Sequence, residues 1–144
     1  MGEAAWIETY RGMVYPWQCD HQGHLTTMHY LGMFDQAGWH LLSRLGLGPE
    51  QLANQGRGFV DVKDTLEYLA EQRVGSLILV ASALRKVGGT SLTLAHRMTN
   101  AATGQLAARC EMVAVHFDLE ARTKLPLPDD LRPRLLAHVV PADA

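Results

Sequence analysis

The sequence predicts a single α+β domain in which one long helix packs against an antiparallel sheet. The chain has 144 residues, of which 47% are hydrophobic, so it is long enough for one domain with a core and too short for two ordinary ones. Between residues 29 and 45 the apolar side chains recur at intervals of three and four, as on one face of a helix. From residue 59 onward the pattern changes to strand-like segments separated by glycine-containing turns. We therefore treat residues 1–144 as one domain.

The predicted elements follow the order strand, long helix and then four strands joined by short turns. The first strand is expected to end near Pro16, because proline cannot donate a ladder hydrogen bond. Gly88 and Gly89 are expected to supply the positive φ angles of a hairpin turn. Pro133 is expected to weaken the last helix. The predicted strands cover 9–17, 59–69, 77–84, 91–99 and 106–117, and short helices are expected at 49–54 and 128–132.

The long helix has features that place it in the core and close to a neighbour. Thr26 or Thr27 is suited to the N-cap position, because a hydroxyl can accept hydrogen bonds from the first free amides of a helix. Gly32 and Gly38 each cost about 1 kcal/mol relative to alanine, which indicates close packing against the sheet or a partner chain. One helix leaves apolar surface of such a sheet uncovered, so we expect self-association as a homodimer or homotetramer.

Composition argues against several classes of partner and site. The net charge of -2 gives no general attraction for polyanions, so neither nucleic acid nor a membrane is expected as a partner. Cys19 and Cys110 are far apart and do not have a metal-binding spacing, which fits a reducing, cytoplasmic setting. Residues 1–6 lack the features of a signal peptide, and no apolar stretch is long enough for a membrane span.

A polar segment directly before the long helix is the main candidate for chemistry. Residues 19–27 read Cys-Asp-His-Gln-Gly-His-Leu-Thr-Thr, so a carboxylate and two imidazoles precede a helix N-terminus, where free amides and the helix dipole favour negative charge. The residue types would suit zinc, but nearly consecutive residues do not converge easily on one tetrahedral centre, so no metal site is predicted. The chain has no glycine-rich nucleotide fingerprint.

The order of these features resembles a known family. A strand is followed by the pattern Asp-x-x-Gly-His-hydrophobic, a tyrosine six residues after the histidine, a long apolar helix and an antiparallel meander. This arrangement resembles the hotdog fold, and within it the 4-hydroxybenzoyl-CoA-type acyl-CoA thioesterases. The resemblance covers residues 13–118 and implies an antiparallel five-stranded sheet wrapped around a long central helix. The residues that carry it are Asp20, Gly23, His24, Leu25 and Tyr30, with Asp35 in the helix where the family often has an acid.

The sequence departs from the family pattern at three positions that bear on the acyl group. Members commonly carry a second acid two positions before the aspartate and two asparagines after the Gly-His pair. This chain has Gln18, Thr26 and Thr27 there. Some betainyl-CoA thioesterases show a similar variation, so a polar or cationic acyl group is compatible with the sequence.

Hydrolysis of a thioester needs few groups, because the thioester is already activated. A carboxylate must attack the carbonyl or deprotonate water, and donors must hold the developing oxyanion. The resemblance assigns the carboxylate to Asp20 and the donor to the helix-start amide at Thr27, next to Met28. His24 completes the catalytic set, in an orienting role more than as a base. The alternative for Asp20 is that it only satisfies loop amides in a turn.

Further residues are candidates for substrate binding. Asp35 is suited to the acyl end of a pocket shared across a dimer, with an exposed helix acid as the alternative. Arg85 and Lys86, just before the Gly-Gly hairpin, are candidates for the phosphates of coenzyme A, with a solvated hairpin as the alternative. The remaining candidates, from the motif and the helix start, are Gly23, Met28 and Tyr30.

Taken with the resemblance, the sequence predicts an acyl-CoA thioesterase that releases free acid and CoA. The expected substrate is a short, aromatic or polar acyl-CoA, and no cofactor is expected. Two alternatives remain at this stage. One is a hotdog hydratase or dehydratase acting on a CoA or carrier-protein thioester, and the other is a non-catalytic acyl-CoA binder.

Overall fold

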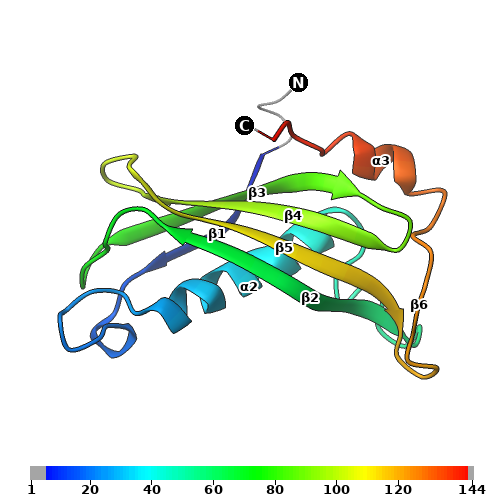
Figure 1. Ribbon diagram of the computed structural model, residues 1–144, viewed down its shortest axis with the longest axis horizontal. Helices are drawn as coiled ribbons and strands as arrows, with labels where there is room; N and C mark the ends of the chain where they lie inside the picture. The colour runs from blue at the N-terminus through cyan, green and yellow to red at the C-terminus, as the bar shows by residue number, and fades with distance from the viewer. Residues whose placement is uncertain (1–5, 143–144) are drawn as a thin grey trace.

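The computed structural model describes residues 6–142 and shows a curved antiparallel sheet that wraps over one long helix, α2 (Figure 1). The strand order is β1-β3-β4-β5-β2, and the short strand β6 pairs with β5. The predicted α+β hotdog architecture is confirmed, with β6 as a sixth strand beyond the five that were expected. The elements are β1 (Ile7–Met13), the 3-10 helix η1 (Pro16–Gln18), α2 (Thr27–Arg44), β2 (Arg57–Tyr68), β3 (Leu77–Val87), β4 (Ser91–Asn100), β5 (Leu106–Asp118), β6 (Thr123–Lys124) and α3 (Arg132–Leu136).

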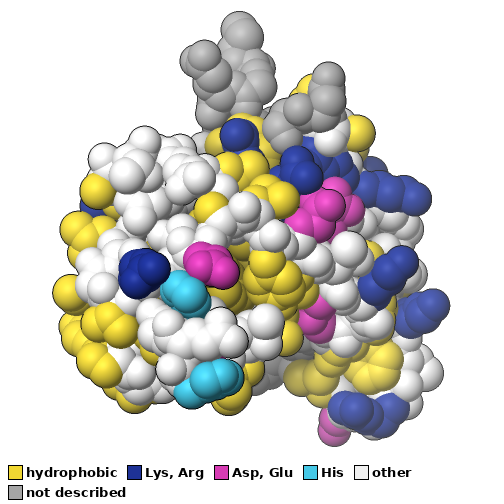
Figure 2. Space-filling view, turned by 60° about the vertical axis from the view of Figure 1, so that its left-hand side comes forward, with side chains coloured by type: hydrophobic (Ala, Val, Ile, Leu, Met, Phe, Trp, Pro, Cys, Tyr) yellow, Lys and Arg dark blue, Asp and Glu magenta, His cyan; other side chains and the backbone are white. Residues whose placement is uncertain are grey.

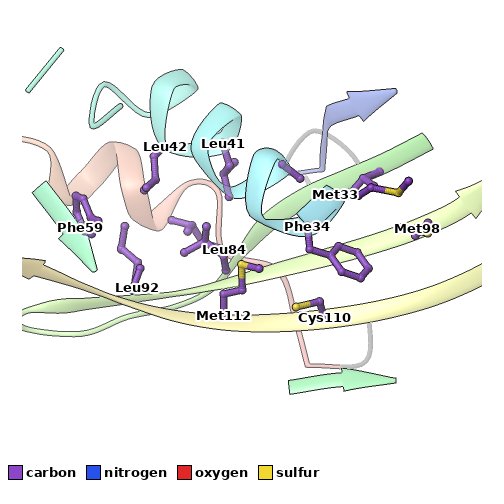
Figure 3. Packing of buried hydrophobic residues seen from close by; sticks show 14 of the residues in the cluster. Met33, Phe34, Leu41, Leu42, Phe59, Leu84, Leu92, Met98, Cys110 and Met112 are labelled. Atoms are coloured by element: carbon purple, nitrogen blue, oxygen red, sulfur yellow. The ribbon is translucent and has the colours of Figure 1, made fainter. Parts of the chain in front are cut away.

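Helix α2 buries one face against the inner surface of the sheet. Its buried side chains recur at the predicted helical spacing, and Figure 3 shows Phe34 and Leu41 close to Leu84 and Met112 of the strands. All four side chains are fully buried, and each such burial contributes about 1.5–3 kcal/mol. A Cβ at Gly38 would lie 3.7 Å from the Met112 sulfur, which confirms the close approach of helix and sheet.

Within residues 6–142 no helix is both long and apolar enough to cross a membrane.

Strand β2 forms one edge of the sheet and extends beyond the cover of α2. The helix packs mainly on β1, β3 and β4, and most side chains of β2 are exposed. The register of β2 against β5 slips between Asp61 and Lys63, so Val62 is an extra, bulged residue. A long edge strand presents free backbone N–H and C=O groups, and it is therefore a surface for pairing with another chain.

The predicted helix at 49–54 is wrong. The segment consists of turns. A side-chain hydrogen bond and a residue in the left-handed conformation interrupt the helical pattern there. The Gly48 amide donates to Gln51 Oε1 at 2.7 Å, and Asn54 takes a left-handed φ of 65°. Such local hydrogen bonds compete with the helical ladder.

Two predictions about prolines are also wrong. Strand β1 ends at Met13, before Pro16, and Pro16 instead begins η1. Pro133 lies in the first turn of α3, where the absent N–H costs no helical hydrogen bond, so it starts the helix rather than weakening it.

The predicted β3–β4 hairpin is confirmed, but the reason for its glycines is different from the expected one. Neither Gly88 nor Gly89 has a positive φ. A Cβ at Gly88 would lie only 3.0 Å from Ser91 Oγ, so close packing and not backbone conformation favours glycine here.

Candidate active site

The polar loop before α2 folds back on itself in a tight turn. Cys19 and Leu25 form an isolated antiparallel bridge. Inside it the Asp20 amide donates to the His24 carbonyl at 2.9 Å, and the Gly23 amide donates to the Asp20 carbonyl at 3.0 Å. Gly23 has a φ of 81°, a conformation that favours glycine. The Asp-x-x-Gly-His spacing is therefore the local requirement of this turn.

The Asp20 carboxylate is exposed and held by loop amides. Its Oδ1 accepts hydrogen bonds from the amides of Gln22 at 2.9 Å and His24 at 3.4 Å. The bond from Gln22 is the main cause that lowers the pKa of Asp20 below its ordinary value, and the nearby His21 and His24 add to this effect. Asp20 is therefore a carboxylate at neutral pH, with Oδ2 left without a hydrogen-bond partner among the described residues.

Asp20 lines a groove of about 330 Å³ together with three other predicted site residues, His24, Thr27 and Tyr30. One wall comes from the polar loop and the start of α2, and the opposite wall comes from residues 68–71 at the end of β2. Figure 2 turns this end of the molecule forward and shows acidic, basic and histidine side chains around hydrophobic ones. The structure therefore brings four of the predicted residues together in one accessible site.

The second wall of the groove contains residues that sequence reasoning did not assign to the site. The rings of Tyr30 and Tyr68 meet edge to face with centroids 5.1 Å apart. His24 Nε2 lies 3.1 Å from Glu71 Oε2, and the His24 side chain is largely buried. Burial of Tyr30 raises the pKa of its hydroxyl, which stays protonated. No local pattern distinguishes Tyr68, the last residue of β2, or Glu71, which follows β2, from neighbouring residues, because only the fold brings them to the loop.

The start of α2 supplies donors beside the carboxylate. Thr26 occupies the N-cap position, but its hydroxyl makes no capping hydrogen bond. No side chain therefore caps the first amides of the helix, and Thr27 lines the groove. Free helix-start amides and the positive end of the helix dipole stabilise an anion. An ionised carboxylate beside oxyanion donors is the arrangement that acyl transfer requires.

Four other predicted binding residues do not line this groove within one protomer, although Met28 directly follows the groove residue Thr27. Asp35 is exposed further along α2 and lines a separate depression. Arg85 pairs with Glu111 through Nε at 3.2 Å, and its guanidinium also donates to the Pro141 carbonyl. Lys86 is exposed, and Met28 is 70% exposed at the helix start. Their roles in substrate binding stay predictions.

Comparisons with known proteins connect this geometry to a family. The chain matches the model of the thioesterase-like superfamily over residues 14–135. A betainyl-CoA thioesterase of Pseudomonas aeruginosa is 25% identical over 131 residues, which is 91% of this chain and 82% of the relative.

Solved structures with the same fold come from several bacteria. A 1,4-dihydroxy-2-naphthoyl-CoA thioesterase from Synechocystis superposes with a TM-score of 0.78 at 22% identity, over 91% of this chain and 96% of that one. A Staphylococcus aureus protein in complex with CoA superposes with a TM-score of 0.83 at 17% identity, over 92% of this chain and 84% of that one. These similarities support the fold. Because the family model covers most of the chain, this protein belongs to the thioesterase-like superfamily, whose named relatives are hydrolases of acyl-CoA thioesters.

Proposed function

We propose that this protein hydrolyses a short, aromatic or polar acyl-CoA to free acid and CoA, with Asp20 as the nucleophile or general base. The observation that carries the proposal is one groove that holds an ionised carboxylate next to a helix start that no side chain caps. Relatives named for betainyl-CoA and dihydroxynaphthoyl-CoA thioesterase activity support the substrate class.

The reaction runs by one of two routes that use the same groups. In the first, an Asp20 oxygen attacks the thioester carbonyl, the C–S bond breaks, CoA leaves as a thiolate, and water then cleaves the mixed anhydride. In the second, Asp20 removes a proton from water, the hydroxide attacks the carbonyl directly, and the C–S bond breaks, so that the CoA thiolate leaves and takes up the proton. In both, the amides at Thr27 and Met28 donate to the oxyanion. Label in Asp20 after a single turnover in heavy-oxygen water identifies the first route, with water attacking the Asp20 carbonyl of the anhydride, because the second route places the label only in the free acid.

A second copy of the chain completes the proposed site. The edge of β2 is open to pairing, and its exposed side chains include Val62 and Tyr68. Two copies related by a two-fold axis pair their β2 edges antiparallel. The end of β2 that carries Tyr68 then lies beside the opposite half of the neighbouring β2. Contacts of Arg85 and Lys86 with CoA phosphates would likewise come from another copy, because neither residue lines the Asp20 groove.

We also propose a cytoplasmic location. Cys19 and Cys110 are both free thiols, as expected in a reducing compartment. Burial raises the pKa of Cys110 to about 12, so its thiol is inert at neutral pH.

The proposed function is tested by replacing Asp20 with asparagine. The variant keeps the size of the side chain but removes the negative charge, so we expect kcat on an acyl-CoA panel to fall by at least about 100-fold. Release of CoA is measured with a thiol reagent. Asp130→Asn is the matched control, because Asp130 is exposed and lies outside the Asp20 groove. This variant should retain wild-type kcat. An Asp20→Asn variant with full kcat/KM, or CoA binding by the wild type without turnover on any thioester, would contradict the proposal.

A further inference from the structure

An open apolar pocket lies at the end of α2 that is far from the Asp20 groove. It is found where β2 begins and β5 ends, whereas the Asp20 loop lies at the other end of the helix (Figure 1). Its volume is about 490 Å³, which is enough for a small organic molecule. Thr27 and Trp39, one from each site, are 12 residues apart on α2, or about 18 Å along its axis. Within one protomer the pocket is therefore separate from the proposed catalytic site.

The walls of this pocket are hydrophobic and come from separate parts of the chain. Trp39 comes from α2, Leu52 from the turns after it, Phe59 from β2, and Leu119 directly follows β5. Leu52 and Phe59 are buried in the core, whereas Trp39 is 40% exposed and Leu119 is 44% exposed. A hydrocarbon group that covered these two exposed side chains would be favoured by the hydrophobic effect.

One charged side chain lies in this apolar lining. Arg57 is the only charged residue among the described residues that line the pocket, and it is half-buried. Its Nε donates to Gln55 Oε1 at 3.0 Å, and its Nη1 lies 2.9 Å from His116 Nε2. Its Nη2 has no hydrogen-bond partner among residues 6–142. The guanidinium is therefore held in place with a donor group left free.

The hydrogen bonds of His116 show that this ring is a neutral acceptor for Arg57. His116 Nδ1 lies 3.0 Å from the Pro126 carbonyl, which can only accept, so Nδ1 carries the proton. Arginine can only donate, so His116 Nε2 must accept from Arg57 Nη1. Burial is the main cause that lowers the pKa of His116, which agrees with a neutral ring at neutral pH. Both acceptors of Arg57 are therefore uncharged.

The acidic side chain opposite Arg57 does not neutralise it. Asp118 is the cross-strand neighbour of Arg57 on β5. Its Oδ1 accepts hydrogen bonds from the amides of Glu120 at 3.0 Å and Ala121 at 2.9 Å. No ion pair within 4.0 Å joins Arg57 to a carboxylate in the part of the chain that the structure describes. A half-buried cation without a carboxylate partner favours an anionic ligand in this pocket.

We propose that this pocket binds a free carboxylic acid with an apolar body, with its carboxylate on Arg57 and its hydrocarbon part against Trp39 and Leu119. A guanidinium binds a carboxylate through charge-assisted hydrogen bonds. The apolar walls favour a hydrocarbon body over a small inorganic anion, which loses hydration without gaining apolar contacts. Thioester hydrolysis releases a free acid, but the inference goes beyond the proposed function, because binding here requires no cleavage.

The test compares hexanoate with hexan-1-ol, which has the same chain without the charge. NMR follows binding at pH 7.5 through the indole N–H groups, because Trp39 lines the pocket whereas Trp6 and Trp17 do not. We expect both ligands to shift the Trp39 signal, with a Kd for hexanoate at least about 10-fold lower. In Arg57→Gln the two Kd values should agree within about twofold, and the Kd for hexan-1-ol should stay within about twofold of wild type.

Two further variants control for charge elsewhere in the protein. Arg11→Gln is the matched control, because Arg11 pairs with Glu8 on β1 and does not line the pocket. It should keep the full preference for hexanoate. Asp20→Asn should bind hexanoate as the wild type does, because Asp20 lines the other groove.

The remaining outcomes overturn the inference or are decided by one more variant. Equal Kd values for the two ligands in the wild type, or no shift of the Trp39 signal with either, overturn it. An unchanged preference in Arg57→Gln, or a changed Kd for hexanoate in Asp20→Asn, also overturns it, because the acid then binds elsewhere. If Arg57→Gln no longer folds or no longer binds hexan-1-ol, Arg57→Lys decides, because lysine keeps the charge. A retained preference for hexanoate supports the site, and its loss overturns it.

These measurements are independent of the proposed function, because none of them uses a thioester. A protein that binds hexanoate at Arg57 and cleaves no thioester contradicts the proposed function alone. A protein that cleaves thioesters and binds the two ligands equally contradicts this inference alone.

Discussion

At the scale of single residues, hydrogen bonds and burial set the charge states of Asp20 and His96. Amides of the loop keep Asp20 ionised. His96 Nδ1 lies within hydrogen-bond distance of the Ser82 hydroxyl, and burial beside the Phe34 ring lowers the pKa of His96 to about 3. At neutral pH Asp20 is therefore charged and His96 is neutral.

The lowered pKa of His96 predicts a loss of stability in weak acid. Below pH 6.5 the unfolded chain binds a proton at this histidine, whereas the folded chain does not until about pH 3. The free energy of unfolding should therefore fall with decreasing pH, by about 1.4 kcal/mol per unit from this group. Urea denaturation at pH 7.5, 6 and 5 measures the slope.

His96→Gln is the comparison for this prediction, because it keeps a polar side chain that does not titrate. Its stability should depend less steeply on pH between 6 and 5 than that of the wild type. Burial also lowers the pKa of His116, which acts with the same sign, so part of the slope should remain. Identical slopes for the variant and the wild type would contradict the assignment.

At the scale of elements, the two glycines of α2 have different surroundings. Gly38 faces the sheet, and its missing Cβ leaves space shared by Leu94, Met112 and His96. Gly32 is exposed, and a Cβ there would meet nothing within 4 Å. From the sequence both glycines were expected to mark close packing, whereas only Gly38 lies against the sheet.

This difference predicts opposite effects of substitution on stability. Gly32→Ala should raise the free energy of unfolding by up to about 1 kcal/mol, because alanine is the better helix former and meets no clash. Gly38→Leu should lower it by about 1–3 kcal/mol, because the side chain overpacks the contact with the sheet. Chemical denaturation of both variants beside the wild type checks this, and a destabilised Gly32→Ala would show that Gly32 is covered by something other than solvent.

At the scale of the whole molecule, the open β2 edge predicts self-association. Light scattering after gel filtration should give a mass that is a multiple of 15.9 kDa. Val62→Lys adds a charge at the exposed bulge, so it should shift the protein toward the monomer and reduce kcat with it. A monomeric wild type with full activity would exclude the shared site.

Most of the correct predictions rest on patterns among residues that are close together in the sequence. The helix at 29–45 was predicted because apolar spacing is a property of neighbouring residues, and it extends from Thr27 to Arg44. The helix predicted at 49–54 does not form, and the Gln51 side chain there accepts a hydrogen bond from the Gly48 amide that competes with the helical ladder.

The sequence by itself determined the order of elements, the long core helix and the carboxylate before its N-terminus, because each depends on spacing within a few residues. Only the tertiary structure decided which residues face that carboxylate. Tyr68 at the end of β2 and Glu71 just beyond it lie against the loop, where His24 and Arg73 form an isolated bridge. Asp61 and Asp64 share a face through one bulged residue. Strand register and bulges are set by contacts between distant segments, so no local pattern specifies them.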